Sequence, residues 1–236
     1  MNLSASVAPH PASYASSLEH FAESQRRLQL STDDICVVST VETTEPSPLA
    51  LAGSHRLRRR DITEGKAGIP VMLTLQLVDY ENRCAAINGA EVYVWHCDAE
   101  GIYSGDHSGP YVTADEESFL RGVQFSNSAG LVSFKTILPG CYQCQLEHIH
   151  VQVLLPSNVP SSRTVLTASA QLYFPYAVTT AAYSNSMLYR PTLNSDRPTQ
   201  AVAALPLPST GNDTLSVSGN ASSGYAASMV IGISSR

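Results

Sequence analysis

Two histidines separated by one residue, His148 and His150, are the residues whose types and spacing most directly suggest chemistry. In an extended strand, alternate side chains point to the same face, so both imidazoles can reach one metal ion. Ile149 would then face the opposite side, toward the core. The alternative interpretation is a pair of surface histidines on a half-exposed strand. The spacing therefore predicts a candidate metal-binding strand that needs further ligands from elsewhere.

Two cysteines just before the histidine pair allow a zinc interpretation. Cys141 and Cys144, together with His148 and His150, are ligands of the kinds that zinc binds. Their close spacing leaves almost no chain to wrap around an ion, which disfavours a finger-like site. A thioredoxin-like role for Cys-x-x-Cys is also disfavoured, because that motif lowers its thiol pKa at a helix N-terminus and a strand is expected to follow here.

Tyrosine supplies a third interpretation, since the chain has 11 Tyr against 5 Phe and 1 Trp. Tyr142 stands in a predicted turn just before the histidine pair, and Tyr103 is expected at the end of the strand that carries Trp95. Two phenolates and two imidazoles form a hard, anionic ligand set suited to Fe(III), and metal binding would deprotonate a phenol whose free pKa is about 10. The alternative for each Tyr is a residue at the edge of the core with its hydroxyl satisfied.

The elements that must position these side chains have the pattern of β-strands. Apolar residues alternate from Ile69 to Leu77, and Val92 and Val94 alternate with Tyr93 and Trp95. Further strands are predicted over 131–137, 148–155, 165–174 and 224–234. Turn residues separate these segments, and strands do not alternate with helices. The sequence thus predicts an all-β fold, a β-sandwich with long irregular loops.

The chain divides into an N-terminal extension and one larger domain. Residues 1–35 are rich in Ala and Ser and predict a short amphipathic helix that packs on the body or at a subunit contact. Residues 36–236 are expected to form the β-sandwich domain. Within it, residues 36–66 have the pattern of irregular structure, and residues 191–223 that of a long surface loop.

Composition excludes two classes of protein. The chain has 236 residues and a net charge of −6, with no basic stripe, so it is a poor candidate for nucleic-acid binding. The one basic run, residues 56–60, is interpreted as a solvated loop. No apolar run reaches the roughly 18–20 residues that a membrane helix needs. No signal peptide is visible, and five cysteines leave the compartment open.

Several segments, taken in order, resemble the intradiol ring-cleavage dioxygenase family. The matching segments are 92–104 (VYVWHCDAEGIYS), 119–124 (FLRGVQ), 130–142 (GLVSFKTILPGCY), 148–150 (HIH) and 170–174 (AQLYF). The likeness extends from about Cys36 to Tyr225. It is strongest to the single-chain, often secreted branch of the family, which lacks the large helical linker of intracellular catechol dioxygenases.

The resemblance implies a non-haem Fe(III) centre with Tyr103, Tyr142, His148 and His150 as ligands, in which Tyr142 leaves when substrate binds. It implies an oxidoreductase that inserts O2 into a catechol-type ring between the two hydroxylated carbons, and Gln171 matches a glutamine that lines the pocket. The expected partners are a small aromatic substrate and O2, in a monomer or homodimer. The resemblance also implies a Cys84–Cys97 disulfide and secretion, whereas the lack of a visible signal peptide leaves a cytoplasmic location open.

Gln145 departs from the family pattern, in which an arginine usually stands three residues before the first histidine. A neutral amide cannot supply the fixed charge that would stabilise negative charge on the substrate, and this loss would cost roughly 2–4 kcal/mol. Two alternatives to ordinary catechol cleavage therefore stay open. One is a ferric enzyme of altered chemistry that tailors an aromatic natural product, and the other is a non-catalytic phenol- or metal-binding β-sandwich.

Overall fold

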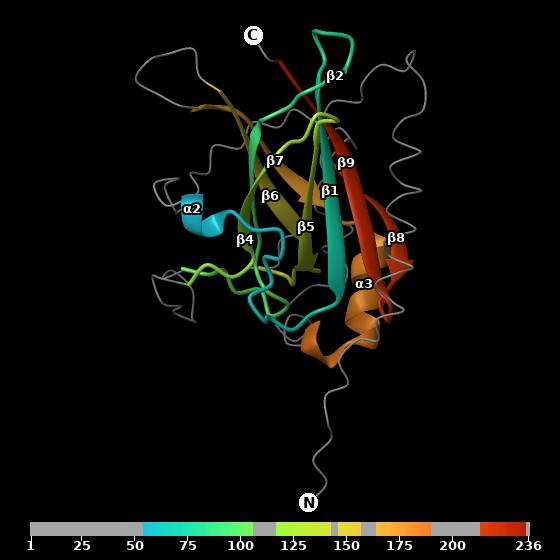
Figure 1. The fold of residues 1–236 in the computed structure, drawn as a ribbon. Helices are drawn as coiled ribbons and strands as arrows, with labels where there is room; N and C mark the ends of the chain where they lie inside the picture. The colour runs from blue at the N-terminus through green and yellow to red at the C-terminus, as the bar shows by residue number, and fades with distance from the viewer. Residues whose placement is uncertain (1–53, 106–116, 143–145, 157–163, 190–212, 235–236) are drawn as a thin grey trace, which may run out of the picture.

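The computed structural model describes residues 54–105, 117–142, 146–156, 164–189 and 213–234. These residues form two β-sheets packed face to face, with short helical segments beside them (Figure 1). The predicted β-sandwich is therefore confirmed. The predicted helix in residues 1–35 lies outside the described residues.

The first sheet is built around strand β1 (Pro70–Asp79). Along one edge, β1 pairs antiparallel with β5 (Leu131–Ile137) and, near its end, with the two-residue strand β2 (Ala85–Ala86). Along the other edge, β1 pairs in parallel with β9 (Gly224–Ile233), and β8 (Ser216–Asn220) then pairs antiparallel with β9. Strand β1 is the central strand of this sheet, because both of its edges are paired.

The second sheet has the order β4–β3–β6–β7, and every pair in it is antiparallel. Its strands are β4 (Arg121–Phe125), β3 (Glu91–Trp95), β6 (His148–Pro156) and β7 (Thr164–Tyr173). Strand β6, which carries both histidines, is an inner strand with a partner on each side. The predicted strands over 148–155 and 165–174 are thus confirmed within one or two residues at their ends.

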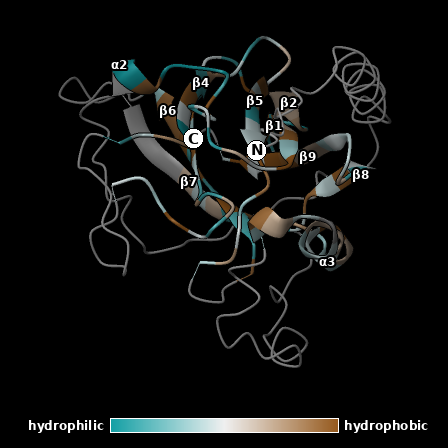
Figure 2. Ribbon diagram, turned by 90° about the horizontal axis from the view of Figure 1, so that it is seen from below, coloured by the Kyte–Doolittle hydropathy of each residue, from teal (hydrophilic) through white to brown (hydrophobic). Residues whose placement is uncertain are grey.

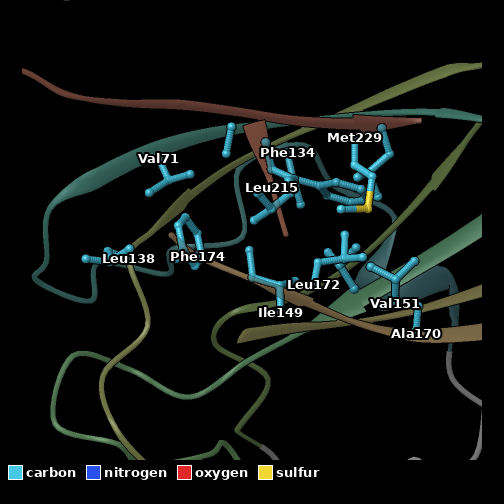
Figure 3. Packing of buried hydrophobic residues seen from close by; sticks show 14 of the residues in the cluster. Val71, Phe134, Leu138, Ile149, Val151, Ala170, Leu172, Phe174, Leu215 and Met229 are labelled. Atoms are coloured by element: carbon cyan, nitrogen blue, oxygen red, sulfur yellow. The ribbon is translucent and has the colours of Figure 1, made fainter. Parts of the chain in front are cut away.

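The hydrophobic core lies between the two sheets. Figure 3 shows Val71, Phe134 and Met229 from the first sheet facing Ile149, Val151, Ala170 and Leu172 from the second. Ile149 is fully buried in this cluster, as the alternation around the histidine pair predicted. The opposite face of β6 is therefore left for the two histidines.

A strap formed by residues 58–62 closes the side of the sandwich between β4 and β5. It makes a parallel bridge to β4 through Arg58 and Val123, and another to β5 through Asp61 and Lys135. The backbone of Ile62 bonds to Lys135 on one side and to Leu120 on the other, and its side chain is fully buried. Part of the basic run predicted as a solvated loop is thus a structural strap.

Helical structure is limited to short segments. Helix α2 (Ser54–Leu57) lies against β4 and is coloured largely hydrophilic in Figure 2. Helix α3 (Tyr176–Asn185) lies beside β8, and the 3-10 turn η1 (Met187–Tyr189) follows it (Figures 1 and 2). None of the helices among the described residues is long and apolar enough to cross a membrane.

Three features depart from the sequence-based expectations. β8 lies within residues 191–223, which were expected to form a loop, so that prediction is wrong for residues 216–220. Strand β4 and helix α3 were not predicted. Helix α3 has the sequence YAVTTAAYSN, in which apolar and polar residues do not separate onto two faces, because the buried face includes Thr179 beside Ala182 and Tyr183 and the exposed face includes Tyr176.

Candidate metal centre

The outer face of the second sheet brings together polar and aromatic side chains from all four strands. Trp95 pairs with Arg121 on one side and with His150 on the other, and His150 pairs in turn with Gln171. Residues in register across neighbouring strands point to the same face. A row of four side chains therefore crosses the sheet, and His148 lies beside this row because it is two residues before His150 on β6.

Two imidazole nitrogens and one tyrosine hydroxyl oxygen converge at the histidine end of this row. The Nε2 atoms of His148 and His150 lie 3.0 Å apart, and the Tyr103 hydroxyl lies 3.1 Å from Nε2 of His150. Two atoms bound at right angles to one ion, each about 2.1 Å from it, are roughly 3.0 Å apart. The spacing of these atoms is therefore compatible with a shared metal ion.

The hydrogen bonding of His148 presents a lone pair to this point. Its Nδ1 donates to the Leu146 carbonyl at 2.6 Å, so the neutral ring carries its proton there and Nε2 is left as an acceptor. Burial, reinforced by the nearby His148, lowers the pKa of His150 to about 3. The His150 ring is therefore neutral at ordinary pH, the state in which imidazole binds a metal.

Trp95 fixes the orientation of His150. The two rings stack at 4.7 Å between centroids with only 4° between their planes, and the Tyr93 ring also stacks on Trp95, at 4.9 Å between centroids. Trp95 is 5% exposed, and Leu57 of helix α2 packs against the same group. This aromatic stack restricts rotation of the His150 ring, so its Nε2 is held toward Tyr103.

Tyr103 lies on a loop after β3, because the strand ends at Trp95 and does not continue to Tyr103 as expected. The buried Asp98 shapes this loop by accepting hydrogen bonds from the backbone of Glu100 and Ile102, both at 3.0 Å. The ammonium group of Lys66 pairs with the same carboxylate at 2.8 Å. A buried, paired carboxylate therefore organises the turn that leads into Tyr103.

Tyr142 is brought beside Tyr103 by direct backbone contact between two loops. The two rings meet edge to face at 5.0 Å between centroids. A Cβ on Gly101 would lie 2.3 Å from the Cys141 carbonyl oxygen, and one on Gly140 would lie 2.3 Å from the Ala99 carbonyl oxygen. Glycine is needed at both positions, since any side chain would push the two tyrosine loops apart.

Exposure differs between the two kinds of residue at the site. His148 and His150 are 5% and 8% exposed, whereas Tyr103 and Tyr142 are both half-buried. The histidines thus lie at the bottom of the site and the tyrosines lie nearer to solvent. A ligand that approaches from solvent would meet the tyrosine side first.

Gln171 and Gln145 are the other predicted site residues. Gln171 is half-buried beside His150, and its side-chain oxygen accepts a hydrogen bond from the Tyr173 hydroxyl. Gln145 lies outside the described residues. The structure therefore brings together Tyr103, Tyr142, His148 and His150, with Gln171 on the adjacent strand.

The cysteines do not follow the predicted pairing. Cys84 is disulfide-bonded, but Cys97 carries a free thiol that contacts the Gly140 carbonyl oxygen at 3.3 Å, so the expected Cys84–Cys97 disulfide is wrong. Cys97 lies in the interior, directly after the strand that leads to Tyr103, and Cys84 lies in an exposed turn region. Cys141 is also buried and is not part of a disulfide, and Cys144 lies outside the described residues. Within the described part of the chain, no three His, Cys, Asp or Glu residues gather closely enough to hold a metal ion.

Two contributors to the site were not identified from the sequence. The alternation in the sequence places Trp95 on the face opposite to Val94. Its neighbour across the sheet, His150, follows only from the register in which β3 pairs with β6. Arg121 belongs to a segment that matched the family, and no role followed from that match. The sequence feature that could have singled out Arg121 is a lone cation at the start of a strand, in a protein of low charge density.

Replacing Gly101 with alanine should destabilise the protein well beyond the cost of backbone strain. Gly65 provides a matched control, because its φ of +77° is close to the +83° of Gly101 and nothing lies within 4 Å of its Cβ position. We expect Gly65→Ala to lower the free energy of unfolding by about 1–2 kcal/mol and Gly101→Ala to lower it by at least ~2 kcal/mol more. Urea unfolding measures both, and equal losses would contradict the proposed loop contact.

His96 should make the protein less stable in acid. Its Nδ1 donates to the Cys97 carbonyl and its Nε2 accepts from the Thr136 hydroxyl, and burial lowers its pKa to about 4. The unfolded chain, with a histidine pKa near 6.5, binds protons that folded His96 excludes, so stability falls as the pH drops from about 6.5 toward 4.

The His96→Gln variant isolates this effect, because glutamine does not titrate in this range. Between pH 7.5 and pH 4.5, the wild type should lose about 2–3 kcal/mol more unfolding free energy than the variant. Urea unfolding at both pH values gives this difference directly. The same pH dependence in both proteins would show that His96 is protonated in the folded state.

Comparison with known proteins identifies the family of the chain. Residues 46–175, more than half of the chain, match a family model described as dioxygenase. A search of curated proteins gives no match.

Two solved structures illustrate the similarity. An intradiol ring-cleavage dioxygenase from Tetranychus urticae is 28% identical, with a TM-score of 0.62 over 75% of this chain and 87% of that chain. The dioxygenase domain of a dioxygenase carbohydrate-binding protein fusion from Streptomyces sp. SirexAA-E is 20% identical, with a TM-score of 0.52 over 84% of this chain and 98% of that domain. The second comparison concerns the fold alone. From its sequence match and its fold, the chain belongs to the intradiol ring-cleavage dioxygenase family.

Proposed function

We propose that this protein is a non-haem Fe(III) dioxygenase that cleaves a catechol-type ring between its two hydroxylated carbons. The observation that carries the proposal is the convergence of the Tyr103 hydroxyl with the Nε2 atoms of His148 and His150, at 3.0–3.1 Å. The ring of Tyr142 lies against that of Tyr103 and supplies the fourth ligand in this proposal.

The donor set suits Fe(III) better than zinc. Two phenolate oxygens are hard, anionic donors, and neutral imidazoles complete a set that compensates most of the charge of a trivalent ion. A zinc site of cysteines and histidines is not favoured, because no three His, Cys, Asp or Glu side chains cluster in the described ranges. Tyr103, Tyr142, His148 and His150 would hold the iron.

The chain's own residues then have separate tasks. Fe(III), when bound, supplies the Lewis acid that makes a chelated catecholate reactive toward O2. Trp95 and the Leu146 carbonyl hold the two imidazoles in place, and half-buried Tyr142 would meet a substrate that enters from solvent. Tyr142, as a phenolate, would accept a proton from the catechol, which would give it a role as a base as well as an iron ligand.

Gln171 is placed to orient the substrate. It is the register partner of His150, and its amide oxygen is engaged by the Tyr173 hydroxyl. This bond turns the amide nitrogen away from Tyr173, so the nitrogen is available to donate to an oxygen of the ring. Gln145 would contribute a neutral amide where the family usually has arginine, which makes the rate with simple catechols lower than the fold alone would suggest.

Loading with Fe(III) tests the metal assignment. The loaded protein should be red-brown from phenolate-to-iron charge transfer, and Tyr103→Phe and Tyr142→Phe should each lower the visible absorbance per bound iron, because each removes one phenolate. Tyr80→Phe is the control, since Tyr80 is 43% exposed and is not part of the site. A colourless protein that binds zinc in preference to iron would refute the proposal.

Oxygen uptake with catechol then separates cleavage from binding. An active enzyme consumes O2 together with catechol, whereas a non-catalytic phenol-binding protein changes colour on adding catechol and consumes none. We expect uptake that depends on bound iron and is lost in His150→Ala.

Gln145→Arg should raise turnover of catechol at least ~10-fold, because it restores the positive charge that the family usually has at this position. Gln145→Leu serves as the control for side-chain size without charge or amide. Steady-state kinetics with catechol and O2 measure the effect, which should appear in kcat more than in KM. An unchanged kcat in Gln145→Arg would mean that position 145 does not limit the reaction, and would favour a substrate other than a simple catechol.

A further inference from the structure

Arg121 is a fully buried guanidinium whose partners are all uncharged. It is 1% exposed and is the largest of the fully buried side chains. Its three nitrogen atoms donate to the Ser104 hydroxyl, the Tyr93 hydroxyl and the Ser104 carbonyl, at 2.8–2.9 Å. The ion pairs among the described residues use Arg59, Lys66 and Lys135 as cations, and none includes Arg121.

Burying an unpaired charge is costly, so its hydrogen bonds must be well made for the fold to tolerate it. A guanidinium is planar and holds its donors in a fixed fork. Two arms of that fork bind the hydroxyl and the carbonyl of a single residue, Ser104. Ser104 follows Tyr103 directly, so the guanidinium fixes the residue next to Tyr103 and thereby limits how the Tyr103 backbone can move.

The backbone around Arg121 is itself held in place by a contact with the strap. Its neighbour Leu120 is buried and has a φ of +58°, a left-handed conformation that costs a leucine about 1–2 kcal/mol. The Arg59 side chain binds the Arg121 carbonyl through two nitrogens, at 3.0 and 2.8 Å. Such strain persists only where the surroundings determine the conformation, and the Arg59 contact from the strap is part of that support.

The Ser104 hydroxyl connects Arg121 with the segment just before β4. It accepts from the Arg121 Nε and donates to the Phe119 carbonyl at 2.8 Å. Next to Tyr103, the loop is thus joined to the segment before β4 through the Ser104 side chain, and not through a strand ladder.

We propose that Arg121 is a positioning residue that holds the Tyr103 loop in its binding geometry before any metal arrives. Its meaning for catalysis depends on the proposed function, in which Tyr103 is a ligand, but the positioning itself is a property of the metal-free chain. Beyond the end of β3 the loop has no strand pairing, and the hydrogen bonds from the Arg121 guanidinium to Ser104 hold it instead.

Hydrogen exchange of the metal-free protein tests this directly. The amides of Gly101 and Ile102 bond to Asp98, so they exchange only when the loop opens. In Arg121→Met, exchange in residues 101–105 should become at least ten times faster than in the wild type. Exchange in β5, residues 131–137, reports global stability in the same sample and should change much less.

Two further variants complete the experiment. Arg121→Lys keeps the charge and loses the fork, so residues 101–105 should exchange faster than in the wild type and more slowly than in Arg121→Met. If Arg121→Met does not fold, Arg121→Lys alone decides the question. Arg83→Met is the control, because it removes an exposed cation in the turn between β1 and β2 of the first sheet, and it should leave 101–105 unchanged.

Equal acceleration in 101–105 and in β5 would mean that Arg121 only stabilises the fold, and the proposal would be overturned. No change in 101–105 in folded Arg121→Lys would overturn it as well. The Fe(III) absorbance of the same variants gives the link to function, because it should fall toward that of Tyr103→Phe. A wild type that binds no iron would refute the proposed function and leave the exchange result, and with it the positioning role, intact.

Discussion

The site depends on the antiparallel pairing of β6 between β3 and β7. Side chains of a strand alternate between its two faces, so a slip of one residue would turn both histidines into the core and Ile149 out of it. The register is continuous from His148 to Val153, and its irregularity falls after Val153, beyond the histidines. The core side of the strand and the site side are therefore fixed by the same set of hydrogen bonds.

Histidines and tyrosines are supported in different ways. The histidines lie on an inner strand and are buried, so the sheet itself holds them. The tyrosines lie on loops, where the support comes from the buried Asp98, from the Arg121 fork and from two glycines that let the loops touch. This division matches a site with a rigid base and a side that must admit a substrate, as the proposed function requires.

The sequence was most informative where one strand determines the answer. The alternation around Ile149 placed the histidine pair on the outer face, and the turn residues separated most strands correctly. It was less informative where two distant segments meet. The stacking of Trp95 on His150 depends on the cross-strand register, which no local pattern encodes.

The errors have similar physical causes. Cys84 and Cys97 were expected to pair by resemblance to relatives, but a disulfide needs two side chains at one place, and Cys97 points into the packing beside Gly140. The short β8 is rich in Ser, Gly and Asn, so its strand conformation comes from pairing with β9 and not from its own propensity. Tertiary contacts decide both cases.

The parallel pairing of β1 with β9 determines when the first sheet can be completed. These strands are separated by most of the described chain, yet their residues are direct neighbours from Val71 to Asp79. As the protein is synthesised, one edge of β1 stays open until β9 has left the ribosome, and an open apolar edge is where unwanted association between chains begins. Such long-range closure also makes folding slow. The order of synthesis thus exposes an aggregation-prone edge for almost the whole time that the domain is being made.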